Sequence, residues 1–238
     1  MRSRLAAPAV LLTLLLTFGC TRTTEGIEVD IAYETPATPQ AVRSDADTRI
    51  WLDRALIAMG PVELVECDNF ARVLGRFFTA SRAKAHAPET PTQLGTPFVL
   101  DLLEGTGFSF VVGTLRPPPG RYCSLRVVGT PADSDAVGLK NNAEMLDHSV
   151  VLSGEAEDTN TLERTPFLLQ LRAPVVRELR FDEPLVLDRP TTVNISVRID
   201  HMRWFDGIDF AQFAQPEGAA VQQKLTTNIE SSMAAESL

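Results

Sequence analysis

An acidic segment near the middle of the chain carries the residues best suited to binding a metal ion. With Asp133 counted as position one, Asp135 stands at position three and Glu144 at position twelve. Gly138 takes position six. EF-hand calcium loops place carboxylates and a turn glycine at these positions, because Ca²⁺ takes six to eight oxygen ligands. Val137 stands where such a loop usually has an oxygen ligand, and a solvated acidic loop between strands is the alternative interpretation.

The three histidines offer a second set of metal ligands. We expect His148 at the start of one strand and His201 at the end of another, close to Trp204. Imidazole suits copper and zinc, so the fold could bring His148 and His201 together as a copper site. Their spacing is too irregular for one helix or strand to do so. Surface positions and packing against aromatic residues are the alternative.

Patterns for catalysis are sparse. Ser81 and Lys84 form an S-x-x-K pair, but the K-T-G and S-D-N elements that accompany it in penicillin-recognising enzymes do not occur. Asp200, Asp206 and Asp209 could supply paired acids for hydrolysis, although a turn and a packing segment also explain them. No nucleophile is paired with a base, so we expect a protein without enzyme activity.

The N-terminus has the pattern of an export signal. Arg2 and Arg4 precede an uncharged apolar run over residues 5–18. As a helix this run would cover about 21 Å, less than the roughly 30 Å of a bilayer core, which favours a signal peptide over a membrane-spanning helix. The run ends at Gly19-Cys20, which resembles the lipobox of bacterial lipoproteins. An ordinary secretory peptide is the alternative.

The lipobox resemblance implies that residues 1–19 are removed and that Cys20 is acylated, with residues 20–26 as a tether. Two or more acyl chains anchor a protein stably, so a membrane is the first expected partner and an envelope protein the second. Thr21, by the sorting habits of such lipoproteins, favours the outer over the inner membrane. The net charge of −9 and the lack of a basic patch argue against binding to nucleic acid.

The two remaining cysteines, Cys67 and Cys123, form an even pair in an expected oxidising compartment. Both lie in strand-like segments, which favours a disulfide between strands. The bridge would close a loop of about 55 residues and stabilise the fold by roughly 4 kcal/mol in the chain-entropy treatment. Two separate buried thiols are the alternative.

Short strands separated by turn signals predict a mainly β fold. Alternating or apolar runs recur at intervals of about 8–12 residues, a pattern typical of sandwiches and barrels. The expected strands cover residues 27–33, 49–59, 62–67, 98–103, 108–115, 122–128, 148–155, 167–172, 175–181, 184–187 and 191–200. Val221, Leu225 and Ile229 have helical spacing. We therefore expect one antiparallel β-sandwich-like domain over residues 27–238, with a short C-terminal helix.

Several stretches resemble those of a set of bacterial cell-envelope lipoproteins: RIWLDRALIAMGPVELVEC, FVLDLLEG, GTLRPPPGRYCSLRVV and RIDHMRWFDGIDF. Their layout is also distantly similar to that of the MbnP-like β-sandwich, a periplasmic copper-binding family. The matching parts are residues 100–103, 120–122, 129–131 and 195–200. The Asn-His pair of that family does not occur after Pro131, so the resemblance implies the fold rather than copper ligands.

Three functions remain open from the sequence. The first is a lipid-anchored binding or structural module of the cell envelope without catalytic activity. The second is a periplasmic metal-binding protein, using calcium in the Asp133 loop or copper at the histidines. The third is an envelope hydrolase.

Overall fold

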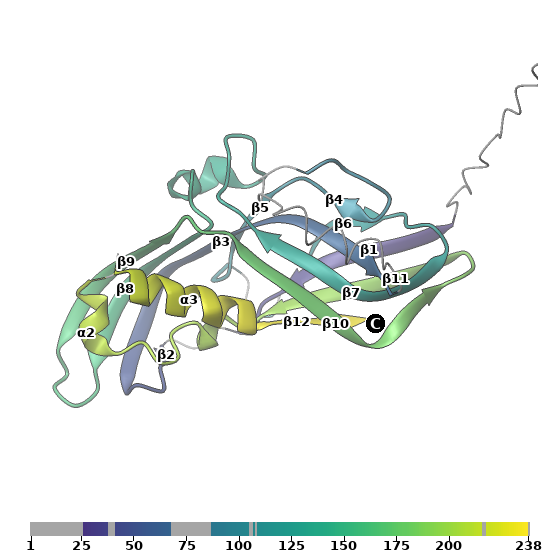
Figure 1. The fold of residues 1–238 in the computed structure, drawn as a ribbon. Coiled ribbons are helices and arrows are strands. Elements are labelled where there is room, and N and C mark those ends of the chain that lie inside the picture. Colours follow the sequence, from purple (N-terminus) through teal and green to yellow (C-terminus); the bar gives the residue numbers. More distant parts are fainter. Residues whose placement is uncertain are drawn as a thin grey trace, which may run out of the picture.

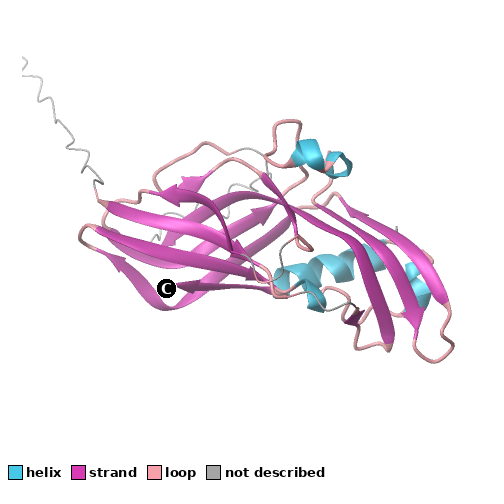
Figure 2. Cartoon of the chain, turned by 180° about the vertical axis from the view of Figure 1, so that it is seen from behind, coloured by secondary structure: helices cyan, strands magenta, loops and turns pink. Residues whose placement is uncertain are grey.

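The computed structural model describes residues 26–37, 41–67, 87–104, 107, 109–215 and 218–237. Two β-sheets and a C-terminal helix make up an elongated molecule (Figures 1 and 2). This confirms the expected mainly β, sandwich-like fold with a short C-terminal helix. Cys20 and residues 1–19 lie outside the described residues, as does the Ser81–Lys84 pair.

The smaller sheet has the order β12-β11-β1-β6 and the larger one the order β10-β7-β3-β8-β9, with three short strands on β3. The smaller sheet comprises β12 (Met233–Ser237), β11 (Thr191–Ile199), β1 (Ile27–Glu34) and β6 (Ser109–Leu115). The larger comprises β10 (Val175–Leu187), β7 (Gly120–Gly129), β3 (Thr48–Glu66), β8 (Val150–Asp158) and β9 (Arg164–Leu171). The short strands on β3 are β2 (Val42–Arg43), β4 (Gln93–Leu94) and β5 (Phe98–Asp101).

One pairing departs from the antiparallel pattern. β1 and β11 run parallel, with Ile27 opposite Thr191 and Glu34 opposite Arg198. Parallel neighbours need a long crossover rather than a hairpin, and here most of the chain lies between the two strands. All strands of the larger sheet therefore lie, in sequence order, between β1 and β11.

Two strands continue through prolines at which the sequence predicts breaks. β3 passes through Gly60-Pro61, where its register with β7 shifts between Met59 and Val62. β10 likewise passes through Pro184, within the register shift from Arg180 to Leu185. A β-bulge leaves a residue unpaired, so a proline without an N–H is tolerated there. The predicted pairs of strands are thus single bulged strands.

β3 is apolar on both faces because both faces are covered. Ala55, Ile57 and Met59 belong to the main core between the sheets, whereas Leu56 and Ala58 face a second, smaller core. The second core lies under the segment between β7 and β8, which contributes Ala132, Ala136 and Met145. That segment contains two 3₁₀ turns, η1 (Leu139–Asn141) and η2 (Ala143–Met145).

The C-terminal region closes one end of the main core. A 3₁₀ turn, η3 (His201–Arg203), and a short helix, α2 (Phe210–Phe213), precede α3 (Ala219–Ser231), which lies beside the larger sheet (Figure 1). Val221, Leu225 and Ile229 of α3 are buried, which confirms the predicted helical face. After α3 the chain returns to the smaller sheet as β12. The sequence does not predict this strand, because Met-Ala-Ala-Glu-Ser has no β-branched or aromatic residue.

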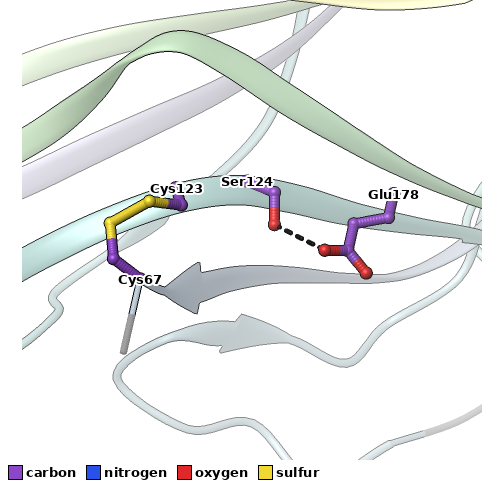
Figure 3. Close-up of a disulfide and its surroundings, with 4 residues drawn as sticks. All are labelled: Cys67, Cys123, Ser124 and Glu178. Atoms are coloured by element: carbon purple, nitrogen blue, oxygen red, sulfur yellow. Dashed lines mark hydrogen bonds between the residues drawn. A yellow bond between two sulfur atoms is a disulfide. The ribbon is translucent and has the colours of Figure 1, made fainter. Parts of the chain in front are cut away.

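The predicted disulfide joins Cys67 to Cys123, as Figure 3 shows. Tyr122 pairs with Glu66 and Ser124 with Val65, so Cys123 between them is an extra, unpaired residue of β7. Such a bulge turns a side chain out of the regular alternation. It places Cys123 within reach of Cys67, directly after β3, with a Cα–Cα distance of 4.7 Å.

Candidate functional site

The carboxylate of Glu144, a predicted calcium ligand, is paired with the guanidinium group of Arg54. Its Oε1 accepts hydrogen bonds from Arg54 Nη2 at 2.6 Å and Nε at 3.1 Å. Arg54 also donates to Asn142 Oδ1 at 2.8 Å and to Asp101 Oδ2 at 3.2 Å. A backbone hydrogen bond of Glu144, followed by the bond from Arg54, lowers the pKa of this carboxyl. Arg54 thus joins the segment between β7 and β8 to β3 and β5.

The geometry gives the calcium interpretation no support. Asp133 and Asp135 lie at the start of the segment, where the Asp133 carbonyl accepts a turn hydrogen bond from Ala136 N at 3.2 Å. The turn η1 separates them from Glu144, which belongs to η2, whereas an EF-hand loop wraps its ligands around one ion. Among the described residues, no group of three or more His, Cys, Asp or Glu side chains could hold a metal ion.

The two histidines of the predicted copper site have separate surroundings. His201 is fully buried after β11, edge-on to Trp204 with ring centroids 6.4 Å apart, and burial lowers its pKa. His148 precedes β8, and its Nδ1 lies 2.8 Å from the carbonyl oxygen of Leu146. His201 therefore has the predicted packing position beside the aromatic residues, and neither histidine belongs to a three-ligand cluster in the described part of the chain.

Asp206 and Asp209, two of the aspartates considered for hydrolysis, have different surroundings in the fold. Asp209 caps the N-terminus of α2, where its side chain accepts from Gln212 N at 3.1 Å. Burial, followed by the charge of Asp45, raises the pKa of Asp206. Asp45 in turn accepts a hydrogen bond from Gly207 N. Asp209 is thus a capping residue rather than one of a pair of catalytic acids.

A pocket of about 220 Å³ lies at the C-terminal end of β1. Three parts of the chain form its wall: the end of β1, β5 with the turn after it, and the start of β6. The lining residues are Tyr33, Thr35, residues 99–102, Glu104 and Phe110. The wall combines apolar residues with two hydroxyl and two carboxylate side chains, and sites for small organic molecules likewise combine apolar surface with polar groups.

Tyr33 is the most unusual residue of this pocket. Its side chain is 2% exposed, and its buried hydroxyl has no hydrogen-bond partner in the described part of the chain. A buried hydroxyl without a partner costs about 1–3 kcal/mol. Burial raises the pKa of Tyr33, so the hydroxyl keeps its proton and can both donate and accept.

The acidic residues of the pocket differ in their surroundings. Asp101 is fixed, because Oδ1 accepts from Leu103 N at 3.0 Å and Oδ2 accepts from Arg54. Glu104 follows in an exposed turn. Phe110 is 42% exposed and meets Phe98 edge-on, with ring centroids 6.3 Å apart. The pocket wall therefore includes an exposed aromatic ring and an exposed carboxylate.

A second pocket, of about 280 Å³, shares Thr35 with the first. It is lined by Glu34, Thr35, Pro36, Gly107, Ser109, Arg198 and Glu236. Successive strand residues point to opposite faces of a sheet. Tyr33 faces the core, so Glu34 turns toward the other face, where it accepts from Ser196 Oγ at 2.6 Å. The two pockets thus lie on either side of the end of β1.

The sequence did not identify this site. Tyr33 ends a predicted strand, and Asp101 belongs to one of the stretches that carry the lipoprotein resemblance. Whether a tyrosine hydroxyl finds a partner depends on residues distant in the chain, so no local pattern could have shown it.

No helix in the described ranges is long and apolar enough to cross a membrane. Comparison with known proteins adds no relationship: no protein family, curated protein or solved structure matches this chain.

Proposed function

We propose that this protein is a non-catalytic binding module that holds a small organic molecule in the Tyr33 pocket. The observation that carries this proposal is Tyr33, which lines the pocket and whose buried hydroxyl has no hydrogen-bond partner among the described residues. A ligand with an apolar body and one polar group fits both features. Its polar group would form the hydrogen bond that Tyr33 lacks, and its body would cover Leu100 and Phe110.

The chain contains only two tyrosines, Tyr33 and Tyr122, which makes a direct test possible. Tyr122 already donates to the Pro118 carbonyl at 2.7 Å and is not part of the pocket. With isotope-labelled tyrosine in the full chain, NMR should show two sets of ring signals, assigned with Tyr122→Phe. Titration with 1-hexanol should shift the Tyr33 signals saturably and leave those of Tyr122 in place.

Tyr33→Phe should weaken 1-hexanol binding by about fivefold, the effect of one net hydrogen bond. Equal affinity in the variant would remove the proposed role of the hydroxyl. If 1-hexanol shifted neither tyrosine, or shifted both alike, the pocket would not be a binding site.

We further propose that the module is tethered to the cell envelope through a lipid on Cys20. The support is the apolar run that ends at Gly19-Cys20, together with a disulfide, which is typical of proteins that fold in an oxidising compartment. Intact-mass measurement of protein from its native host should find a chain that begins at acylated Cys20. A chain that retains Met1 and carries no acyl group would contradict the tether without bearing on the pocket.

A further inference from the structure

The charges around the pocket point to the class of ligand. Asp101 and Glu104 line the first pocket, and Glu34 and Glu236 line the second, where Arg198 is the one basic residue among the described lining residues. Arg54 lies against Asp101, but it is shared with Glu144, whose oxygen is the closer of the two. Carboxylates therefore outnumber guanidinium groups among the described lining residues of the two pockets.

Glu104 is the acidic residue best placed to meet a charged ligand. It is exposed at the pocket wall, and no ion-pair partner lies within 4.0 Å among the residues with described positions. Arg54 acts on it only as a more distant charge. Phe110 lines the same pocket with 42% of its surface exposed. The exposed carboxylate favours a ligand with a positive charge, and the exposed ring favours one with an apolar body.

We propose that the ligand is an organic cation: the polar group that bonds to Tyr33 is an ammonium group, Glu104 in the same pocket wall attracts its charge, and its apolar body covers Leu100 and Phe110. This inference rests on the proposed function, because it names the chemistry of the ligand at the same pocket. Glu104 selects the positive charge, whereas Tyr33 bonds to the polar group and the apolar wall covers the body. Anionic ligands of the same shape are disfavoured by the surrounding carboxylates.

Three probes that share one chain and differ in charge test this selection: hexylammonium, 1-hexanol and hexanoate. At low ionic strength, hexylammonium should bind about threefold tighter than 1-hexanol, the size of one partly exposed charge interaction, and hexanoate should bind more weakly than 1-hexanol. Added salt should reduce the preference, because exposed charges are screened.

Glu104→Gln should abolish the preference for hexylammonium over 1-hexanol. The matched control is Glu163→Gln, which removes the same charge from the exposed connection between β8 and β9. This control should keep the preference. If 1-hexanol binds at Tyr33 but hexylammonium binds no tighter, or if both variants lose the preference equally, the cation proposal fails and the pocket stands. If no probe shifts the Tyr33 signals, the proposed function itself fails.

Discussion

Replacing each of the two tyrosines by phenylalanine should change the free energy of unfolding in opposite directions. Both side chains are almost completely buried, but Tyr122 donates a hydrogen bond at 2.7 Å and the hydroxyl of Tyr33 has no partner in the described residues. Tyr33→Phe removes a polar atom whose burial is not compensated, so the free energy of unfolding should rise by about 1 kcal/mol. Tyr122→Phe removes a formed hydrogen bond, so the free energy of unfolding should fall by about 1 kcal/mol.

Both changes delete the same single atom, so each variant is the control for the other. For a domain of this size, 1 kcal/mol corresponds to about 2–4 °C in melting temperature. Thermal and urea unfolding of the ligand-free full chain should therefore place Tyr33→Phe above the wild type and Tyr122→Phe below it. A loss of stability in Tyr33→Phe would show that its hydroxyl is satisfied in the folded protein, and the reasoning for a ligand at this hydroxyl would be refuted.

The same tyrosines make the stability depend on alkaline pH. Burial, followed by the charge of Glu66, raises the pKa of Tyr122 to about 12, and burial raises that of Tyr33 further. In the unfolded chain both phenols titrate near pH 10. The stabilisation that follows from these raised pKa values is complete below pH 10 and is lost as the pH rises through the folded-state values. Phenolate absorbance should stay absent from folded protein just above pH 10, and its appearance there without unfolding would contradict the burial of both rings.

Three further predictions concern the framework around the site. Cys123→Ser should lower the free energy of unfolding by up to about 4 kcal/mol, and a melting temperature insensitive to reductant would contradict the bridge. Arg54→Gln should lower the free energy of unfolding, measured with urea, by about 1 kcal/mol, because the bonds to Glu144 and Asp101 are lost. No change would show that these bonds contribute as little as an ordinary surface ion pair. Gly154→Ala should unfold or strongly destabilise the chain, because the added Cβ would lie 1.9 Å from the Trp51 carbonyl oxygen; circular dichroism that matches the wild type would count against this close approach.

Local patterns determined much of the secondary structure. The alternation from Ile27 to Tyr33 predicts β1, because one face of a strand at the edge of a core must be apolar. The spacing of Val221, Leu225 and Ile229 predicts the buried face of α3. The disulfide is predicted from the even pair of cysteines that remains when Cys20 is set aside as the expected lipidation site. These features depend on residues close in sequence or on simple counting.

The tertiary structure decided the features that depend on a distant partner. The local sequence around Pro61 predicts the end of a strand. β3 nevertheless continues through Pro61, because its pairing with β7 contains a bulge there. β12 forms only because β11 offers an edge for it to pair with. Glu144 has the spacing of a calcium ligand, but Arg54, ninety residues earlier, binds it instead. The unpartnered hydroxyl of Tyr33 has the same physical origin, since hydrogen bonds are short-ranged and only the folded chain determines which groups come within reach.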